Sequence, residues 1–127
     1  MILVAAAVIK KDKQVLISRR AEGKHLAGYW EFPGGKIEPG ETPEACLKRE
    51  VFEELSIHIE INSFLAENLH EYSEKRILLK GYLCTYISGD MRLVDHDRAE
   101  WVNIDELSNF KIAPADIPFI TILTQLS

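Results

Sequence analysis

The sequence is poor in cysteine, and its cysteines and histidines do not form a recognisable metal motif. Cys46 and Cys84 are the only two cysteines among 127 residues, too few for a disulfide framework and too far apart for a CxxC site. The four histidines are scattered, with no two at the spacing of zinc ligands. We therefore expect neither a disulfide-stapled scaffold nor a structural zinc site.

The sequence also lacks an excess of positive charge and a long hydrophobic run. Its formal net charge is −5, which argues against sequence-independent binding to duplex nucleic acid. The apolar start, MILVAAAVIKKD, is too short to cross a bilayer and lacks the basic region and cleavage site of a signal peptide. We expect a cytoplasmic protein that binds neither nucleic acid nor a membrane.

What the sequence does contain is typical of a globular domain. With 46% hydrophobic and 28% charged residues, it suits one domain over residues 1–127. Hydrophobic patterns predict strands at 2–9, 14–19, 30–32, 57–61, 63–70, 76–87 and 99–104. A helix is predicted from Pro43 to about Leu55 with Thr42 as N-cap, and another over 114–127 with Asp116 as cap and Pro118 in its first turn. This order predicts an α/β or α+β sandwich around a mixed sheet.

The stretch REVFEEL, residues 49–55, concentrates three carboxylates on one face of the first helix. At about 100° per residue, Glu50, Glu53 and Glu54 fall within roughly 100° of one another, beside Arg49. The opposite arc is apolar and is expected to be buried; it comprises Ala45, Leu47, Val51, Phe52 and Leu55. Glu50 and Glu54 repel each other at i,i+4 and oppose the helix dipole, so local stability does not explain the cluster. A solvated polar face is the simpler alternative, whereas bound Mg²⁺, which prefers oxygen ligands, would explain the crowding.

The loop before this helix supports the interpretation of a metal site. Gly34 and Gly35 allow the backbone to approach a ligand closely. Glu41 adds a carboxylate, either to support the loop or to bind a further metal, and Lys36 adds a positive charge. An ordinary glycine-rich turn is the alternative for this loop.

Together these residues resemble the Nudix box, G-x5-E-x7-R-E-U-x-E-E-x-G-U, where U is a bulky aliphatic residue. The matching positions are Gly35, Glu41, Arg49, Glu50, Val51, Glu53, Glu54 and Ile57. Ser56 stands where the motif has glycine, just past the helix, so we expect a modestly strained helix end. The stretches RRAEGKHLAGYWEFPGGKIEPGETPEA and APADIPF resemble the MutT branch of the family. The resemblance implies the Nudix α/β/α sandwich with a central mixed β-sheet.

The resemblance also implies roles for the residues of the box. Glu50, Glu53 and Glu54, with the carbonyl of Gly35, would hold Mg²⁺, or Mn²⁺ in its place. Glu53 and Glu50 would also take part in catalysis. Arg49 would orient Glu53 or Glu50 through a charge-assisted hydrogen bond, unless it forms only a surface salt bridge.

Further candidates lie outside the box. By the same resemblance, Arg20 and Lys36 would contact phosphates. In DHDRAEW, residues 95–101, Asp95 matches an acid that MutT-type chains carry before a tryptophan, and it would serve as a metal ligand or general base. A hydrophilic turn is the alternative interpretation, and His96 is expected to be structural.

Base recognition is expected at Asp116, where MutT-type enzymes carry an Asn or Asp that faces the base. An ionised carboxylate there would accept a hydrogen bond from an exocyclic amino group. Capping of the last helix is its alternative role. Phe32, Tyr82 and Leu83 would supply apolar or stacking surface for the base, or belong to the core.

The resemblance implies a Mg²⁺-dependent hydrolase that converts a nucleoside triphosphate to the monophosphate and pyrophosphate by attack at the β-phosphorus. The candidate substrates are 8-oxo-dGTP, in a sanitising role linked to DNA repair, and CTP, dCTP or a modified pyrimidine triphosphate. Alternatives are hydrolysis of ADP-ribose or dinucleoside polyphosphates, and nucleotide binding without turnover. The complete charged set of the box argues against the last. The sequence leaves monomer and homodimer equally open.

Overall fold

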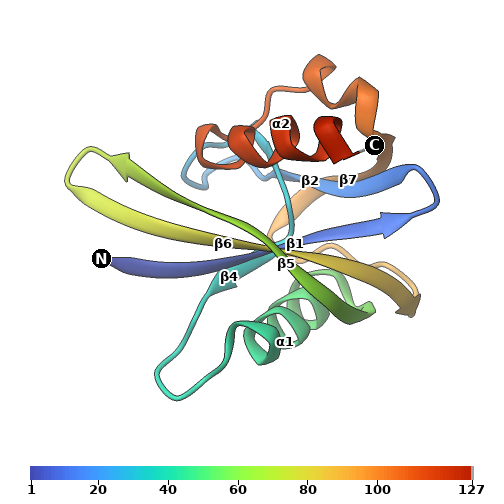
Figure 1. Ribbon diagram of the computed structural model, residues 1–127, viewed down its shortest axis with the longest axis horizontal. Helices are drawn as coiled ribbons and strands as arrows, with labels where there is room; N and C mark the ends of the chain where they lie inside the picture. The colour runs from blue at the N-terminus through green and yellow to red at the C-terminus, as the bar shows by residue number, and fades with distance from the viewer. Residues whose placement is uncertain (127) are drawn as a thin grey trace.

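A computed structural model describes residues 1–126 and shows a mixed β-sheet with a helix on each face (Figure 1). The strands are β1 (Ile2–Lys11), β2 (Gln14–Arg20), β3 (Trp30–Glu31), β4 (Gly34–Lys36), β5 (His58–Tyr72), β6 (Lys75–Ser88) and β7 (His96–Asn103). The helices are α1 (Pro43–Leu55) and α2 (Ile117–Leu126), and two short 3-10 segments are η1 (Ile104–Asn109) and η2 (Pro114–Asp116). Within residues 1–126, no helix is long and apolar enough to cross a membrane.

The sheet is mixed because β1 runs parallel to β6 and antiparallel to β2. Its main path is β3-β2-β1-β6-β5, with β4 also paired to β1 and β7 also paired to β2. β1 and β2 pair only at their connecting ends, and β4 pairs with β1 at residues 4–6. In Figure 1, α1 and α2 lie on opposite sides of this sheet. The predicted sandwich around a central mixed sheet is therefore confirmed.

The apolar start of the chain is the central strand β1, buried on both faces. Ala5, Ala7 and Ile9 pack into the core beneath α1, whereas Ala6 and Val8 pack into the core beneath α2. Successive side chains of a strand point to opposite faces, so a strand covered on both faces needs an unbroken apolar run. This explains why the first residues superficially resemble a targeting segment.

Helix α1 begins and ends as its sequence predicts. The Thr42 side chain accepts a hydrogen bond from the Ala45 N–H at 3.1 Å, and Pro43 is the first helical residue. Ser56 closes the helix at φ 59°, a left-handed conformation that favours glycine, and its N–H donates to the Phe52 carbonyl at 2.9 Å. The strain expected at this helix end therefore arises from the left-handed backbone conformation of Ser56.

The buried face of α1 differs in part from the predicted one. Of the predicted residues, those buried are Leu47, Val51 and Leu55. Ala45 and Phe52 are exposed, and Phe52 stacks on His58 at the surface. Cys46, which helix geometry places near the acidic face, is fully buried, because β4 covers it with the backbone carbonyls of Gly35 and Lys36. Burial raises the pKa of the Cys46 thiol to about 12, so it is an inert core residue.

Several element boundaries were also predicted wrongly. Residues 57–61 and 63–70 do not form two strands: from residue 58 on they belong to one strand, β5, which continues through a shift of register between Ile61 and Ser63. The glycine pair, predicted as loop, forms β4 against β1. The segment predicted as a helix from 114 begins with the 3-10 turn η2, and the predicted last residue, Ser127, lies outside the described residues.

Candidate active site

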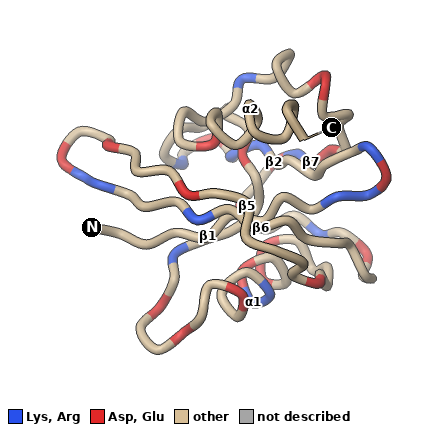
Figure 2. The backbone as a smooth tube through the Cα atoms, viewed as in Figure 1, with Lys and Arg blue, Asp and Glu red and all other residues tan. Residues whose placement is uncertain are grey.

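A cleft of about 970 Å³ lies against the first half of β1. Its lining comes from β1, from the β3–β4 region, from the end of α1, from the β5–β6 turn and from the segment 113–116. Figure 2 shows acidic residues gathered on α1 and on the loop before it. The cleft thus joins the acidic helix to the C-terminal segment, which are far apart in sequence.

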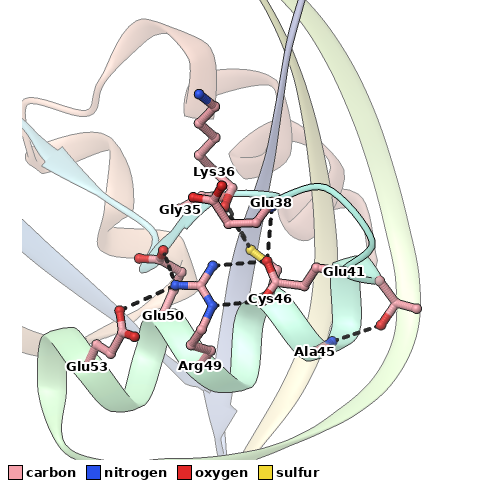
Figure 3. A network of polar contacts seen from close by, with 10 residues as sticks. Gly35, Lys36, Glu38, Glu41, Ala45, Cys46, Arg49, Glu50 and Glu53 are labelled. Atoms are coloured by element: carbon pink, nitrogen blue, oxygen red, sulfur yellow. Dashed lines mark hydrogen bonds and ion pairs between the residues drawn. The ribbon is translucent and has the colours of Figure 1, made fainter.

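Arg49 is the centre of an ion-pair network that organises the acids of α1 (Figure 3). Its Nε and Nη2 donate to the two carboxylate oxygens of Glu41 at 2.7 and 2.9 Å. Its Nη1 donates to Glu50 at 2.8 Å and to Glu53 at 3.3 Å. The hydrogen bonds from Arg49 lower the pKa of Glu41 to about 2. Glu41 therefore anchors the loop to the helix, and Arg49 has the geometry needed to orient both Glu50 and Glu53.

Gly35 lies directly against the carboxylate of Glu50 (Figure 3). A Cβ atom at this position would stand 2.4 Å from Cδ and 2.5 Å from Oε2 of Glu50. Only glycine leaves room for the carboxylate in this position, so β4 can approach α1 closely here.

The carboxylates of Glu54 and Glu50 lie deeper than that of Glu53, since their side chains are 15% and 17% exposed against 58%. The Glu54 side chain is mostly buried, and its pKa is raised to about 9, first by burial and then by a hydrogen bond with Glu50 and by the charge of Glu31. These acids crowd together without enough positive charge among them. Within residues 1–126, no three acidic, histidine or cysteine side chains already converge as a metal cage. The donor chemistry nevertheless fits a divalent cation such as Mg²⁺, which takes carboxylate and carbonyl oxygens.

A second polar network, which the sequence did not reveal, is built on Glu31. Its carboxylate accepts from Arg20 Nε at 3.1 Å and lies 2.9 Å from Nε2 of His96. The Nδ1 of His96 is 3.9 Å from Glu54 and has no hydrogen-bond partner among residues 1–126. The network links Arg20 to the acidic helix through a buried histidine. A charged residue between Trp30 and Phe32 in a short apolar strand was the only sequence signal for it.

At the C-terminal side of the cleft, Asp116 is buried and bound to the backbone just after β3. Its Oδ2 accepts a hydrogen bond from the Phe32 N–H at 2.8 Å. Burial, followed by the charge of Glu31, raises the pKa of Asp116 to about 7. Phe32 lines the cleft, whereas Tyr82 packs in the core beneath α1 and Leu83 packs against the other core. The structure thus brings together Asp116 and Phe32, but not the other two aromatic or apolar candidates.

The remaining candidates lie at the edge of the cleft or away from it. Arg20 and Lys24 line it, and Lys24 lies 3.5 Å from Asp95, whose side chain is exposed at the rim. Lys36 is exposed and, in Figure 3, projects away from Glu50. Of the two predicted phosphate contacts, only Arg20 therefore faces the cleft in this arrangement.

Comparisons with known proteins agree with this geometry. A sequence model of the NUDIX domain matches residues 4–121. The chain is 35% identical to the CTP pyrophosphohydrolase of Escherichia coli K12, over 94% of this chain and 89% of that protein. It is 33% identical to the 8-oxo-dGTP diphosphatase of the same organism, over 97% of this chain and 96% of that protein.

A structural comparison gives the same result. The crystal structure of a MutT protein from Methanosarcina mazei Go1 superposes with a TM-score of 0.88 and 26% identity, covering 98% of this chain and 94% of the other. The match extends over both helices and the sheet, beyond the short box in which the acids lie. The chain therefore belongs to the Nudix family, in its MutT branch, and is a hydrolase that acts on phosphoric anhydrides.

Proposed function

We propose that this hydrolase converts nucleoside triphosphates to the monophosphate and pyrophosphate with the help of Mg²⁺, for which Mn²⁺ can substitute. The observation that carries the proposal is that one cleft is lined by Glu54 and Gly35 and also by Phe32 and Asp116. The first pair suits a metal–polyphosphate end, and the second suits a base. The names of the E. coli relatives, a CTP pyrophosphohydrolase and an 8-oxo-dGTP diphosphatase, support this substrate class.

At the polyphosphate end, Glu50, Glu53, Glu54 and the carbonyl of Gly35 would hold the cation. The cation would stabilise negative charge that develops on the phosphates. Arg49 keeps Glu50 and Glu53 oriented, since it donates to both.

A second set of residues would contact the phosphates and activate the attacking water. Arg20 lines the cleft and would contact the phosphates, a role for which Lys36 is less well placed. Asp95, at the rim, is the candidate general base for a water that forms a bond to the β-phosphorus. The bond between that phosphorus and the oxygen bridging to the α-phosphorus breaks, so the monophosphate leaves and pyrophosphate keeps the oxygen of water.

At the base end, Asp116 would read an exocyclic amino group. An ionised carboxylate accepts a hydrogen bond from the amino group of cytosine or guanine, and uracil offers no such donor. Phe32 would supply apolar surface beside it, because it is buried and lines the cleft. We expect hydrolysis of several triphosphates, with those that carry an exocyclic amino group preferred.

A substrate panel tests this proposal. Values of kcat/KM are measured with Mg²⁺ for CTP, dCTP, 5-methyl-dCTP, dGTP, 8-oxo-dGTP and dUTP, with ADP-ribose as comparison. Reaction in ¹⁸O-labelled water shows which product takes up the oxygen. We expect the label in pyrophosphate and dUTP among the poorer substrates. Release of orthophosphate and a diphosphate, or faster turnover of ADP-ribose than of every triphosphate, would refute the proposal.

A further inference from the structure

The segment that carries Asp116 is held from two sides. On one side it follows β3: the Trp30 N–H donates to the Lys111 carbonyl, and the Ala113 N–H donates to the Trp30 carbonyl, both at 2.8 Å. The carboxylate of Asp116 adds a further hydrogen bond on this side by accepting from the Phe32 N–H. These contacts fix the segment against one edge of the cleft.

On the other side, the segment is held by a side chain of the edge strand β5. The Asn68 side-chain amide donates to the carbonyl of Ala115 at 3.1 Å. The backbone of Ala115 is therefore bound by β5, one residue before Asp116.

Asn68 is set apart from the cleft itself. It is partly buried and lies opposite Leu79 in the β5–β6 register, and it is not among the residues that line the cleft. Its amide is bound to the Ala115 carbonyl, so we expect its effect on substrate choice to pass through Ala115. Asp116 is buried with its carboxylate on a single backbone N–H, and its own N–H donates to Ala113. A shift of Ala115 would move this carboxylate relative to Phe32.

We propose that Asn68 is a positioning residue for base selection, acting through Ala115 to fix the carboxylate of Asp116. The inference rests on the proposed function, in which Asp116 reads the base. It predicts that a residue outside the cleft changes discrimination between bases more than it changes turnover. The reason is that Glu50 and Glu53 are held by hydrogen bonds from Arg49, which do not involve β5.

The experiment compares Asn68→Ala with Asn62→Ala. Asn62 lies on the same strand and also makes one side-chain hydrogen bond, to Thr85, but it is exposed. The ratio of kcat/KM for dCTP to that for dUTP is measured for each full-length variant, along with kcat alone. We expect Asn68→Ala to reduce the ratio by about threefold to tenfold, the range that one hydrogen bond supplies, mainly through KM for dCTP. Asn62→Ala should match the wild type.

A second comparison tests the route through Asp116. In an Asp116→Ala background, Asn68→Ala should change the ratio no further, because residues that act through one another are not additive. A loss of kcat that is equal for both nucleotides, or an undiminished effect of Asn68→Ala in that background, would overturn the inference. If the wild type hydrolyses no triphosphate, the proposed function fails instead.

A measurement that does not depend on turnover distinguishes failure of the positioning role from failure of the proposed function. The Phe32 N–H is bonded to Asp116, so its hydrogen exchange reports how firmly the carboxylate is held. We expect Asn68→Ala to speed exchange of this amide by about threefold to tenfold relative to amides of β1, with no change in Asn62→Ala. Unchanged exchange at Phe32 in Asn68→Ala would show that Asn68 does not position Asp116.

Discussion

Substitution of Gly35 by alanine tests whether the tight approach of β4 to α1 serves the site or only the fold. The new Cβ would stand 2.4 Å from Cδ of Glu50. Carbon atoms in ordinary contact are about 3.5 Å apart, so the carboxylate must retreat by about 1 Å. The atoms that must move belong to a side chain, and the strand and helix backbones can stay in place. Overpacking of this kind costs about 1–3 kcal/mol of stability.

The effect on activity should be larger than the effect on stability. A misplacement of about 1 Å at a catalytic group can lower the rate by about 100-fold. We therefore expect Gly35→Ala to fold but to lose about 100-fold in kcat/KM on the best triphosphate, measured with saturating Mg²⁺. Urea unfolding measures stability in the same preparations.

The neighbouring glycine provides the matched control. A Cβ at Gly34 would stand 2.0 Å from the backbone oxygen of Ala5, so Gly34→Ala must push β4 away from β1. This variant should lose more stability than Gly35→Ala, because a backbone cannot rotate aside as a side chain can. Wild-type kcat/KM in Gly35→Ala, or equal destabilisation by both substitutions, would refute this reasoning.

Three further predictions concern single residues of the site. Glu53→Gln should lower kcat by about 100-fold or more if the helix is catalytic. It should change the free energy of unfolding by less than about 0.5 kcal/mol, because the Glu53 side chain is 58% exposed. An unchanged rate would exclude the proposed mechanism. Burial raises the pKa of Asp116 from 3.8 to about 7, so the folded state keeps a proton that the unfolded chain releases. Relative to Asp116→Asn, the wild type should therefore lose stability as pH rises from about 4 to about 7, by at most about 4 kcal/mol, and a difference independent of pH in urea titrations would contradict this. Ser56→Gly should raise the free energy of unfolding by about 1 kcal/mol, because glycine adopts the left-handed backbone conformation of this position without the strain of a side chain. The value of kcat should be unchanged. A fall in stability would show that the serine side chain supports the helix end.

Local patterns predicted the secondary structure where the pattern and the packing agree. The unbroken apolar run gave β1, and Thr42 with Pro43 marked the start of α1, because caps and periodicity act over a few residues. The predictions failed where a distant strand decides the outcome. Residues 34–36 form β4 only because β1 offers them a partner, and β5 continues past Ile61 only because β6 accommodates its shifted register.

The acids of α1 are fixed by local sequence. The spacing of Glu50, Glu53 and Glu54 places them on one face through helix geometry alone. What surrounds them depends on the tertiary fold. It set Gly35 against Glu50, joined Glu31 to His96 and Glu54, turned Lys36 outward, and brought Asp116 to Phe32 from 84 positions away. Contacts between segments so far apart depend on sheet order and on helix packing, which no short stretch of sequence encodes.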